Sequence, residues 1–267
     1  MKVRISSAQI APSWGNVKAG LAVAEKYVQA AASADADLCC FPEQFAAGWS
    51  PQRVHAAEST DGLTVATLSA LAREHSIALL GSFVEVHGMQ PRNTAVAIDA
   101  DGRVLATYSK IHLFTPGGEH EHYAAGENLA CFDVNGMRFG IAICYDLRFP
   151  EIFSLYAAEA AACILVPSAW PCSRIRHFEL FVQARALENQ YYVCGINAVG
   201  TTPVDRYCGH SLCADPHGEI VACAGAGPEL MVATLDTDAI EGARRRLPVR
   251  KDRKDALYQS LFREREP

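Results

Sequence analysis

Long apolar runs are lacking in this sequence. A membrane-spanning helix needs roughly 18 or more consecutive apolar residues, and no window of the chain reaches that length. The opening MKVRISSAQIAPSWGN alternates apolar and polar residues, without an apolar core followed by a small-residue cleavage site, so we expect no secretion signal. A soluble, cytoplasmic protein without a membrane partner is expected.

Blocks of like charge are lacking as well. The chain has 30 acidic and 24 basic residues, which are spread along its length and give a net charge of -6. This pattern excludes the basic surface that is typical of nucleic-acid binding, so we expect no nucleic-acid partner. No linker rich in proline or serine divides the 267 residues, which indicates a single domain.

Cysteine is abundant, with ten residues, but the thiols mostly lie in apolar runs such as LCCF, ACILV and YYVCGIN. This placement predicts reduced, buried thiols and not a disulfide framework. One stretch has mixed cysteines and histidines whose spacing fits no common zinc pattern: Cys208, His210, Cys213, His217 and Cys223. We therefore expect no metal.

The apolar patterns predict strands and helices in alternation. Alternating or short apolar runs predict strands, helical spacing predicts helices, and Asp-Gly and Asn-Gly predict hairpin turns. Strands are expected in KVRISSAQI, DLCCFPE, IALLGSFVEV, ACILVPS and YYVCGINAVG, and hairpins in 94–110, 131–144 and 211–224. Helices are expected in 16–32, 62–75, 150–160 and 174–190. A loop is expected in 115–127, and a short strand and a basic segment at the C-terminus.

Hairpins mixed with helix-linked strands favour a layered α/β sandwich with mixed sheets over a purely parallel sheet. The hairpin sequences IDADGRVLAT (98–107) and ADPHGEIVAC (214–223) share Asp, Gly and Ala at matching offsets. This similarity suggests an architecture of two related halves.

Three ionisable residues each follow a predicted strand: Glu43 in FPEQ, Lys110 in YSKIHLF and Cys144 in IAICYD. Ligand sites in α/β sheets gather at strand ends, and a cysteine hydrolase needs a thiolate, a base and an oxyanion donor. The alternative is that the Glu and Lys are surface residues and that Cys144 is an ordinary core residue. The residues alone leave both interpretations open.

Five blocks in order resemble the nitrilase, or carbon-nitrogen hydrolase, superfamily: FPEQFAAGW, YSKIHLF, GIAICYDLRFPE, ARALENQYYV and LPVRKDRKDALY. The resemblance implies a four-layer αββα sandwich, with a hydrolase domain over 1–245 and a tail over 246–267. It also implies a homodimer, or a larger homo-oligomer, in which the tail reaches across to the partner, here with Leu257, Tyr258 and Leu261 as apolar anchors.

The same resemblance implies a catalytic Glu-Lys-Cys triad that needs no cofactor. By position in the motifs, Glu43 is the general base, Lys110 stabilises the tetrahedral intermediate and Cys144 is the nucleophile. The backbone N–H of Tyr145 completes the oxyanion hole. A second glutamate corresponds to Glu119, with Glu121 two residues away as the alternative.

The segment CYDLRFPE resembles the amidase-type branches of the family. The later segments SAWP and RHFELFVQARALENQYYVCGINAVG resemble the omega-amidase branch, which hydrolyses monoamides of dicarboxylic acids. That branch often has Asn-Arg-Val-Gly where this chain has Asn197–Gly200 without the arginine. Arg148 is a candidate for pairing with the substrate carboxylate, or it pairs with Asp146 or Glu151 and stiffens the loop. Trp170 either walls the pocket or is a core aromatic residue.

Other functions remain open from the sequence. Within the family, the substrate is alternatively an N-carbamoyl compound, a nitrile or a deaminated peptide-like amide. A non-catalytic binding protein with this fold is a further alternative. A papain-like Cys-His site would recruit His177 and Asn197, although no local motif supports it.

Overall fold

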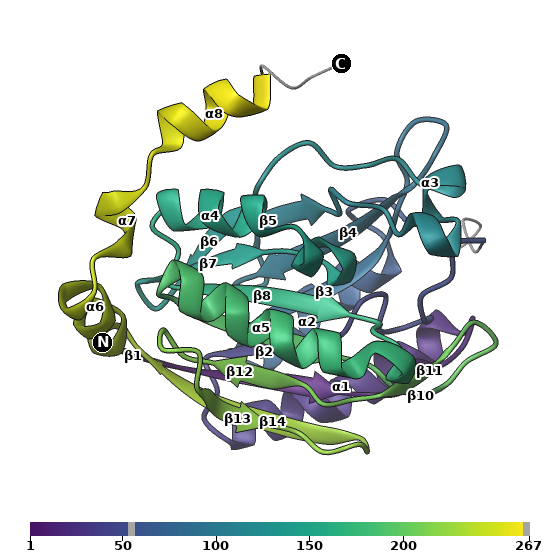
Figure 1. Ribbon diagram of the computed structural model, residues 1–267. Coiled ribbons are helices and arrows are strands. Elements are labelled where there is room, and N and C mark those ends of the chain that lie inside the picture. The colour runs from purple at the N-terminus through teal and green to yellow at the C-terminus, as the bar shows by residue number, and fades with distance from the viewer. Residues whose placement is uncertain (53–56, 264–267) are drawn as a thin grey trace.

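Two six-stranded mixed sheets stack face to face in the computed structural model, which describes residues 1–52 and 57–263 (Figure 1). The first sheet has the order β14 (Glu229–Asp236), β1 (Lys2–Gln9), β2 (Leu38–Cys40), β3 (Ala78–Glu85), β4 (Arg92–Ile98), β5 (Val104–Ser109). The second has the order β13 (Ile220–Cys223), β12 (Leu212–Ala214), β9 (Tyr192–Asn197), β8 (Cys163–Ser168), β7 (Met137–Ile141), β6 (Cys131–Val134).

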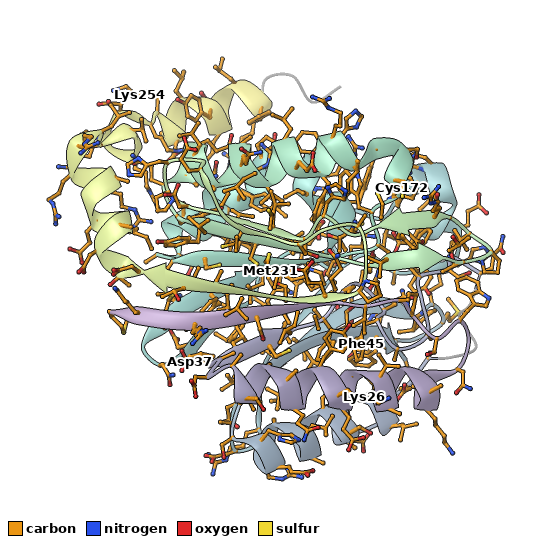
Figure 2. All side chains as sticks on the ribbon, turned by 90° about the horizontal axis from the view of Figure 1, so that it is seen from below. Lys26, Asp37, Phe45, Cys172, Met231 and Lys254 are labelled. Carbon is orange, nitrogen blue, oxygen red and sulfur yellow. The ribbon has the colours of Figure 1, made fainter. Side chains whose placement is uncertain are left out.

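Helices cover the outer face of each sheet. Helices α1 (Val17–Ser33) and α2 (Leu63–His75) pack on the first sheet, and α4 (Pro150–Ala158) and α5 (Ile175–Asn189) pack on the second. Figure 2 shows α1, marked by Lys26, outside the strands of the first sheet. The predicted four-layer αββα sandwich is confirmed.

Strand alternation separates the inner core from the two outer cores. In β2, Leu38 and Cys40 face the second sheet, while Cys39 between them faces the helices. Successive strand residues point to opposite faces, so a short apolar run fills both cores at once. This explains why the strands that lie centrally in each sheet are mostly apolar on both faces.

The two sheets repeat one pattern of strand pairing. From β14 to β5, neighbouring strands pair antiparallel, parallel, parallel, antiparallel and antiparallel. From β6 to β13 the same order of pairing recurs. Helices α1 and α2 therefore correspond to α4 and α5, and the chain consists of two related halves.

The two similar hairpin sequences occupy equivalent places in this repeat. IDADGRVLAT forms the β4–β5 turn and ADPHGEIVAC forms the β12–β13 turn. Asp99 accepts hydrogen bonds from the backbone N–H groups two and four residues ahead, and Asp215 does the same. Gly102 and Gly218 then take φ angles of +78° and +80°. The shared Asp and Gly thus build one turn twice.

The structure differs from the sequence predictions in several segments. The predicted loop 115–127 contains a 3₁₀ turn, η2 (Thr115–Gly117), and a short helix, α3 (Glu119–His122). A further hairpin, β10 (Val199–Thr201) and β11 (Arg206–Cys208), was not predicted as a pair. The expected short C-terminal strand is instead the long strand β14, which pairs with β1 over its full length.

Three helices end the described chain: α6 (Thr237–Arg246), α7 (Val249–Asp252) and α8 (Asp255–Arg263). Figure 1 shows α8 extending away from the sandwich, and residues 251–263 are all exposed. The last four residues of the predicted tail lie outside the described residues. Among the helices described here, none is long and apolar enough to cross a membrane.

We predict opposite effects of alanine at two helical glycines. A Cβ at Gly20 in α1 would lie 2.0 Å from the backbone oxygen of Ala46, so Gly20→Ala forces the helix off the loop and lowers the free energy of unfolding by about 1–3 kcal/mol. Gly242 in α6 has open space around it, so Gly242→Ala raises that free energy by about 0.5–1 kcal/mol. Urea unfolding measures both, and a Gly20→Ala variant as stable as the parent chain contradicts the packing argument.

Candidate active site

A buried lysine lies between two buried carboxylates. The Nζ atom of Lys110, just past β5, is 2.8 Å from Oε1 of Glu43 and 2.8 Å from Oε2 of Glu119. All three side chains are almost fully buried, with at most 2 % of each residue exposed. Glu43 follows β2 and Glu119 begins α3, so three separate segments meet at one ammonium group. Glu121, the alternative to Glu119, is exposed.

The charges of these groups follow from burial and from each other. Burial opposes the charged form of Lys110, but Glu119 and Glu43 outweigh it and hold its pKa well above the usual value. Burial raises the pKa of Glu43, although Lys110 acts in the opposite direction. Burial also acts against the Glu119 carboxylate, yet the attraction and hydrogen bond of Lys110 lower its pKa. Glu119 is therefore the firmer counter-ion, and Glu43 accepts a proton more readily.

Neutral donors complete the hydrogen bonding of both carboxylates. Nδ2 of Asn93 on β4 donates to Oε1 of Glu43 at 2.7 Å and to Oε1 of Glu119 at 3.0 Å. Nε1 of Trp49 and the backbone N–H of Phe114 donate to Glu119. This network fixes the carboxylates, because a buried charge needs a partner for each lone pair. Sequence reasoning missed Asn93 and Trp49 as site residues.

Cys144 begins a 3₁₀ turn, η3 (Cys144–Arg148), with a φ angle of +46°. The strand β7 ends at Ile141, whereas the hairpin was predicted over 131–144, so Cys144 lies beyond the hairpin. A positive φ is costly for a residue with a Cβ, and the surrounding turn holds the thiol out of the sheet. The Cys144 and Glu43 side chains are hydrogen-bonded to each other.

The thiol of Cys144 is protonated at neutral pH. Burial raises its pKa well above the usual value, and the Glu43 carboxylate adds to this, while Lys110 and the backbone of Ala169 act in the opposite direction. Ala169 also donates its N–H to Oε2 of Glu43 at 3.1 Å. A nucleophile of this kind needs a base to remove its proton during attack, and the adjacent Glu43 carboxylate is suitably placed.

Asp146 fastens the turn that carries Cys144. Its buried carboxylate accepts hydrogen bonds from the backbone N–H of Ile143, the hydroxyl of Tyr108, and the backbone N–H of His112. Nδ1 of His112 lies 2.8 Å from Oδ1. Asp146 therefore ties η3 to the end of β5, which Lys110 directly follows. His112, two residues after Lys110, is held against this turn by the same contacts.

Cys144 opens into a narrow pocket with a cavity volume of about 40 Å³. Its wall is mostly aromatic and basic: Glu43, Trp49, Lys110, Phe114, Cys144, Tyr145, Arg148, Ala169, Trp170, Pro171, Arg174, Asp205 and Tyr207. Small ligand sites typically combine apolar walls with a few polar groups. This pocket suits a small, linear substrate with a polar end.

Arg148 lies in the pocket wall, and aromatic rings surround its guanidinium. Its Cζ is 4.9 Å from the ring centre of Trp170 and 5.3 Å from that of Phe181, and Nη2 lies 3.4 Å from Nδ1 of His177. Among the described residues, no carboxylate lies within 4.0 Å of it, whereas Asp146 is saturated by other donors. The alternative that Arg148 pairs with Asp146 or Glu151 is therefore wrong for the described chain.

Trp170 combines both predicted roles. It is 2 % exposed and packs on Phe178. It also lines the pocket, and the guanidinium of Arg148 lies over its ring. Asn197 holds it in place by accepting from its backbone N–H and donating to its carbonyl. The buried Asn197 is thus engaged with the backbone, and nothing in these contacts favours a papain-like role.

The profile of the family described as "Carbon-nitrogen hydrolase" matches residues 4–245. This chain belongs to the carbon-nitrogen hydrolase family. The match covers nearly all of both sheets and their helices, and it agrees with a cysteine, a glutamate and a lysine that meet in one buried pocket.

Several characterised proteins are similar to this hydrolase. The 2-oxoglutaramate amidase of Bacillus subtilis (strain 168) is 30 % identical over 260 residues, covering 97 % of this chain and 100 % of that one. The structure of Nit3 from Saccharomyces cerevisiae, a member of branch 10 of the nitrilase superfamily, superposes with a TM-score of 0.86 at 31 % identity, covering 92 % and 94 % of the two chains.

A third relative is an amidase from Nesterenkonia sp. AN1, solved as an active-site mutant in complex with butyramide. It superposes with a TM-score of 0.86 at 27 % identity and covers 97 % of this chain and 96 % of that one. The family and these relatives together identify the hydrolase as an enzyme that cleaves amides with a cysteine nucleophile.

We predict that Asp146→Asn weakens both the fold and the activity. An amide would turn an N–H₂ group toward donors that now share the carboxylate, which lowers the free energy of unfolding by about 1–3 kcal/mol. We also expect kcat/KM to fall roughly tenfold or more, since a displacement of about 1 Å in a reacting group costs up to about 10²-fold. Urea unfolding and amide turnover provide the measurements.

Asp133→Asn is the matched control for this variant. Asp133 lies on β6 with its side chain 58 % exposed and contacts only Arg138 among the described residues, at 3.5 Å. Its replacement should change the free energy of unfolding by less than about 0.5 kcal/mol. Equal effects of the two substitutions would show that the hydrogen bonds of Asp146 do not hold the turn.

Proposed function

We propose that this hydrolase removes the terminal amide from a small dicarboxylic acid monoamide, such as 2-oxoglutaramate, and releases ammonia. The observation that carries this proposal is the guanidinium of Arg148, which lines the pocket of Cys144 and has no carboxylate partner among the described residues. A substrate carboxylate supplies the missing partner, because a guanidinium pairs with it through two parallel hydrogen bonds.

The proposed reaction begins with the Glu43 carboxylate taking the proton of Cys144. The thiolate attacks the amide carbon, and the oxygen that becomes negative is held by the Lys110 ammonium and the backbone N–H of Tyr145. When the tetrahedral intermediate collapses, the C–N bond breaks, and Glu43 gives its proton to the leaving nitrogen. Ammonia departs and a thioester to Cys144 remains.

Hydrolysis of the thioester uses the same groups again. Glu43 takes a proton from a water molecule, the hydroxide attacks the thioester carbon, and Lys110 with Tyr145 N–H again stabilises the oxyanion. The C–S bond then breaks, and Glu43 returns the proton to the sulfur. General acid–base catalysis typically contributes about 10²–10⁴-fold, and one oxyanion donor about 10²–10³-fold.

The contacts of the site support this division of roles. Glu43 is hydrogen-bonded to the thiol that it must deprotonate, and its raised pKa suits a group that accepts and returns a proton. Glu119 keeps Lys110 charged and oriented. Glu119 is therefore proposed as a positioning residue, which does not itself exchange protons with the substrate.

Arg174 supports recognition of a carboxylate in this particular chain. The omega-amidase branch often has an arginine at the position of Ala198, which here packs with Trp49, Ala169 and Tyr207. Arg174 lines the same pocket, with its Cζ 5.6 Å from the ring centre of Phe114. We propose that Arg148 and Arg174 together provide the positive end of the pocket, with Trp170 as its wall.

We predict that Arg148→Lys separates carboxylate-bearing substrates from neutral ones. Lysine keeps the charge but loses the two-pronged geometry, so KM for 2-oxoglutaramate should rise about 10-fold or more, equal to about 1.4 kcal/mol. KM for butyramide should stay within about twofold of the parent value. Ammonia release from a panel of monoamides, neutral amides, ureides and nitriles gives these constants.

Two controls make this experiment decisive. Arg176→Lys replaces an exposed arginine on α5 that does not line the pocket and should leave both substrates unaffected. Cys144→Ala should abolish ammonia release from every amide, and its failure to do so would refute the proposed nucleophile. An equal rise of KM for both substrates in Arg148→Lys would instead show that Arg148 braces the pocket wall.

We also propose that the hydrolase is a cytoplasmic homodimer. Exposed leucines on α4 and α5 support this: Leu155, Leu180 and Leu187. The tail adds exposed apolar side chains on α8, namely Leu257, Tyr258, Leu261 and Phe262. Apolar residues grouped on an outer layer are typical of a surface that another subunit covers.

We predict that light scattering gives twice the chain mass of 28.9 kDa. Leu180→Glu combined with Leu187→Glu should give monomers, because two charges would then face an apolar partner surface. Leu63→Glu is the matched control, since Leu63 is 45 % exposed on the helix layer of the other sheet. A monomeric, active parent chain would contradict the proposed dimer.

A further inference from the structure

Two cysteines meet beside the pocket. Cys172 begins the 3₁₀ turn η4 (Cys172–Arg174), and Cys208 ends strand β11. The preceding residues, Pro171 and Tyr207, form an isolated antiparallel β-bridge, so the backbones of the two segments already lie side by side. The two thiols are close enough to interact, because Cys172 contributes to the raised pKa of Cys208. Figure 2 shows Cys172 at the surface, at the end of the sandwich where β11 lies.

The accessibility of this pair distinguishes it from another thiol pair in the core. Cys194 and Cys213 lie opposite each other on the paired strands β9 and β12, but both are completely buried between the sheets. Cys172 and Cys208 are each partly exposed. A dissolved oxidant therefore reaches the outer pair without unfolding the chain.

The residues next to both cysteines line the substrate pocket. On one side these are Pro171 and Arg174, and on the other Asp205 and Tyr207. Nε1 of Trp170 also donates to the carbonyl oxygen of Arg174 at 2.8 Å. A covalent link between η4 and β11 would therefore act directly on this part of the pocket wall.

We propose that Cys172 and Cys208 form a reversible disulfide that draws η4 toward β11 and reshapes the substrate pocket. The oxidant is a small disulfide such as oxidised glutathione. The link itself does not depend on the identity of the amide, and only its effect on turnover rests on the proposed function.

The exchange proceeds in two balanced steps. The Cys172 thiol loses its proton and attacks one sulfur of oxidised glutathione, forming a mixed disulfide and releasing one glutathione thiolate. Cys208 loses its proton and attacks the Cys172 sulfur, so the second glutathione leaves and the Cys172–Cys208 bond forms. The protein loses two protons and two electrons, and oxidised glutathione becomes two molecules of glutathione.

The pKa of Cys208 makes the second step pH-dependent. Burial, followed by the interaction with Cys172, raises the pKa of Cys208 to about 12. Because the thiolate is the attacking form, closure of the disulfide should accelerate as the pH rises from 7 toward 9.

Closure changes the geometry of the wall by a distance that matters for catalysis. The two sulfur atoms, which are not bonded in the reduced chain, must approach to about 2.05 Å to form the disulfide. Since a shift of about 1 Å in a positioning group costs up to about 10²-fold, we expect kcat/KM to fall at least about tenfold, mainly through KM. A reductant should restore the starting value.

The experiment treats the full chain with graded ratios of oxidised to reduced glutathione. Linkage is read as an intact mass lower by two hydrogen atoms and as a Cys172–Cys208 peptide in a non-reducing digest. Glutathione bound to Cys144 adds mass instead, so the two modifications are distinguishable. The same digest of Cys144→Ala, which is inactive, measures linkage without that side reaction.

Matched variants assign the effect on turnover. Under reducing conditions, Cys172→Ser and Cys208→Ser should have the same kcat/KM as the parent chain. Oxidised glutathione should lower the kcat/KM of these variants only through modification of Cys144, whereas it should lower that of the parent chain further. Cys131→Ser, at another partly exposed cysteine, should respond like the parent chain.

Two results would overturn the proposal. One is the absence of the linked peptide at glutathione ratios that already modify Cys144. The other is a linked enzyme whose kcat/KM equals that of the reduced enzyme. If the parent chain hydrolyses none of the amides but still forms the disulfide, the proposed function fails and the disulfide does not. Thermal unfolding then tests the disulfide, because the linked chain should unfold at a higher temperature than the reduced chain.

Discussion

The ammonium of Lys110, buried between two carboxylates, is the interaction on which the rest of the site depends. Removing one partner of a buried ion pair typically costs about 3–5 kcal/mol, because it leaves the other charge unpaired. Here the pairs join the end of β5 to the loop after β2 and to α3. Asn93 and Trp49 satisfy the remaining oxygens. The network therefore both organises the chemistry and fixes three loops of the first sheet relative to one another.

The second sheet contributes the nucleophile, and the stacking of the two sheets brings it to this network. Cys144 leaves β7 through a turn with a positive φ, which Asp146 holds by bonds to both halves of the chain. The apolar core between the sheets, to which residues such as Leu38 and Phe139 contribute, sets the distance between the halves. The site thus relies on close packing of a dry interface, because a small slip of one sheet would separate the thiol from its base.

The sequence predicted the layers and the places of most strands, because strand and helix periods are local properties. It also placed Glu43, Lys110 and Cys144 after strands, since such residues interrupt apolar runs. It could not predict α3, whose four residues are held by the bonds of Glu119 to Lys110 and Phe114 and not by helical propensity. Asn93 was missed because one polar residue at the start of a strand is an ordinary feature, and its role arises only from contacts with distant residues. The stacking of Arg148 on Trp170 is likewise a tertiary contact.

The pairing of β14 with β1 has a consequence for how the chain is made. The strand that completes the first sheet spans Glu229–Asp236, whereas every other strand of that sheet lies before residue 110. During synthesis from the N-terminus, β1 therefore keeps an open edge until almost the whole chain has emerged, and such an edge is prone to pair with other molecules. The catalytic side chains are all synthesised long before this strand. Nascent chains should accordingly carry the complete set of reactive residues well before β14 is made, while the scaffold that aligns them closes last.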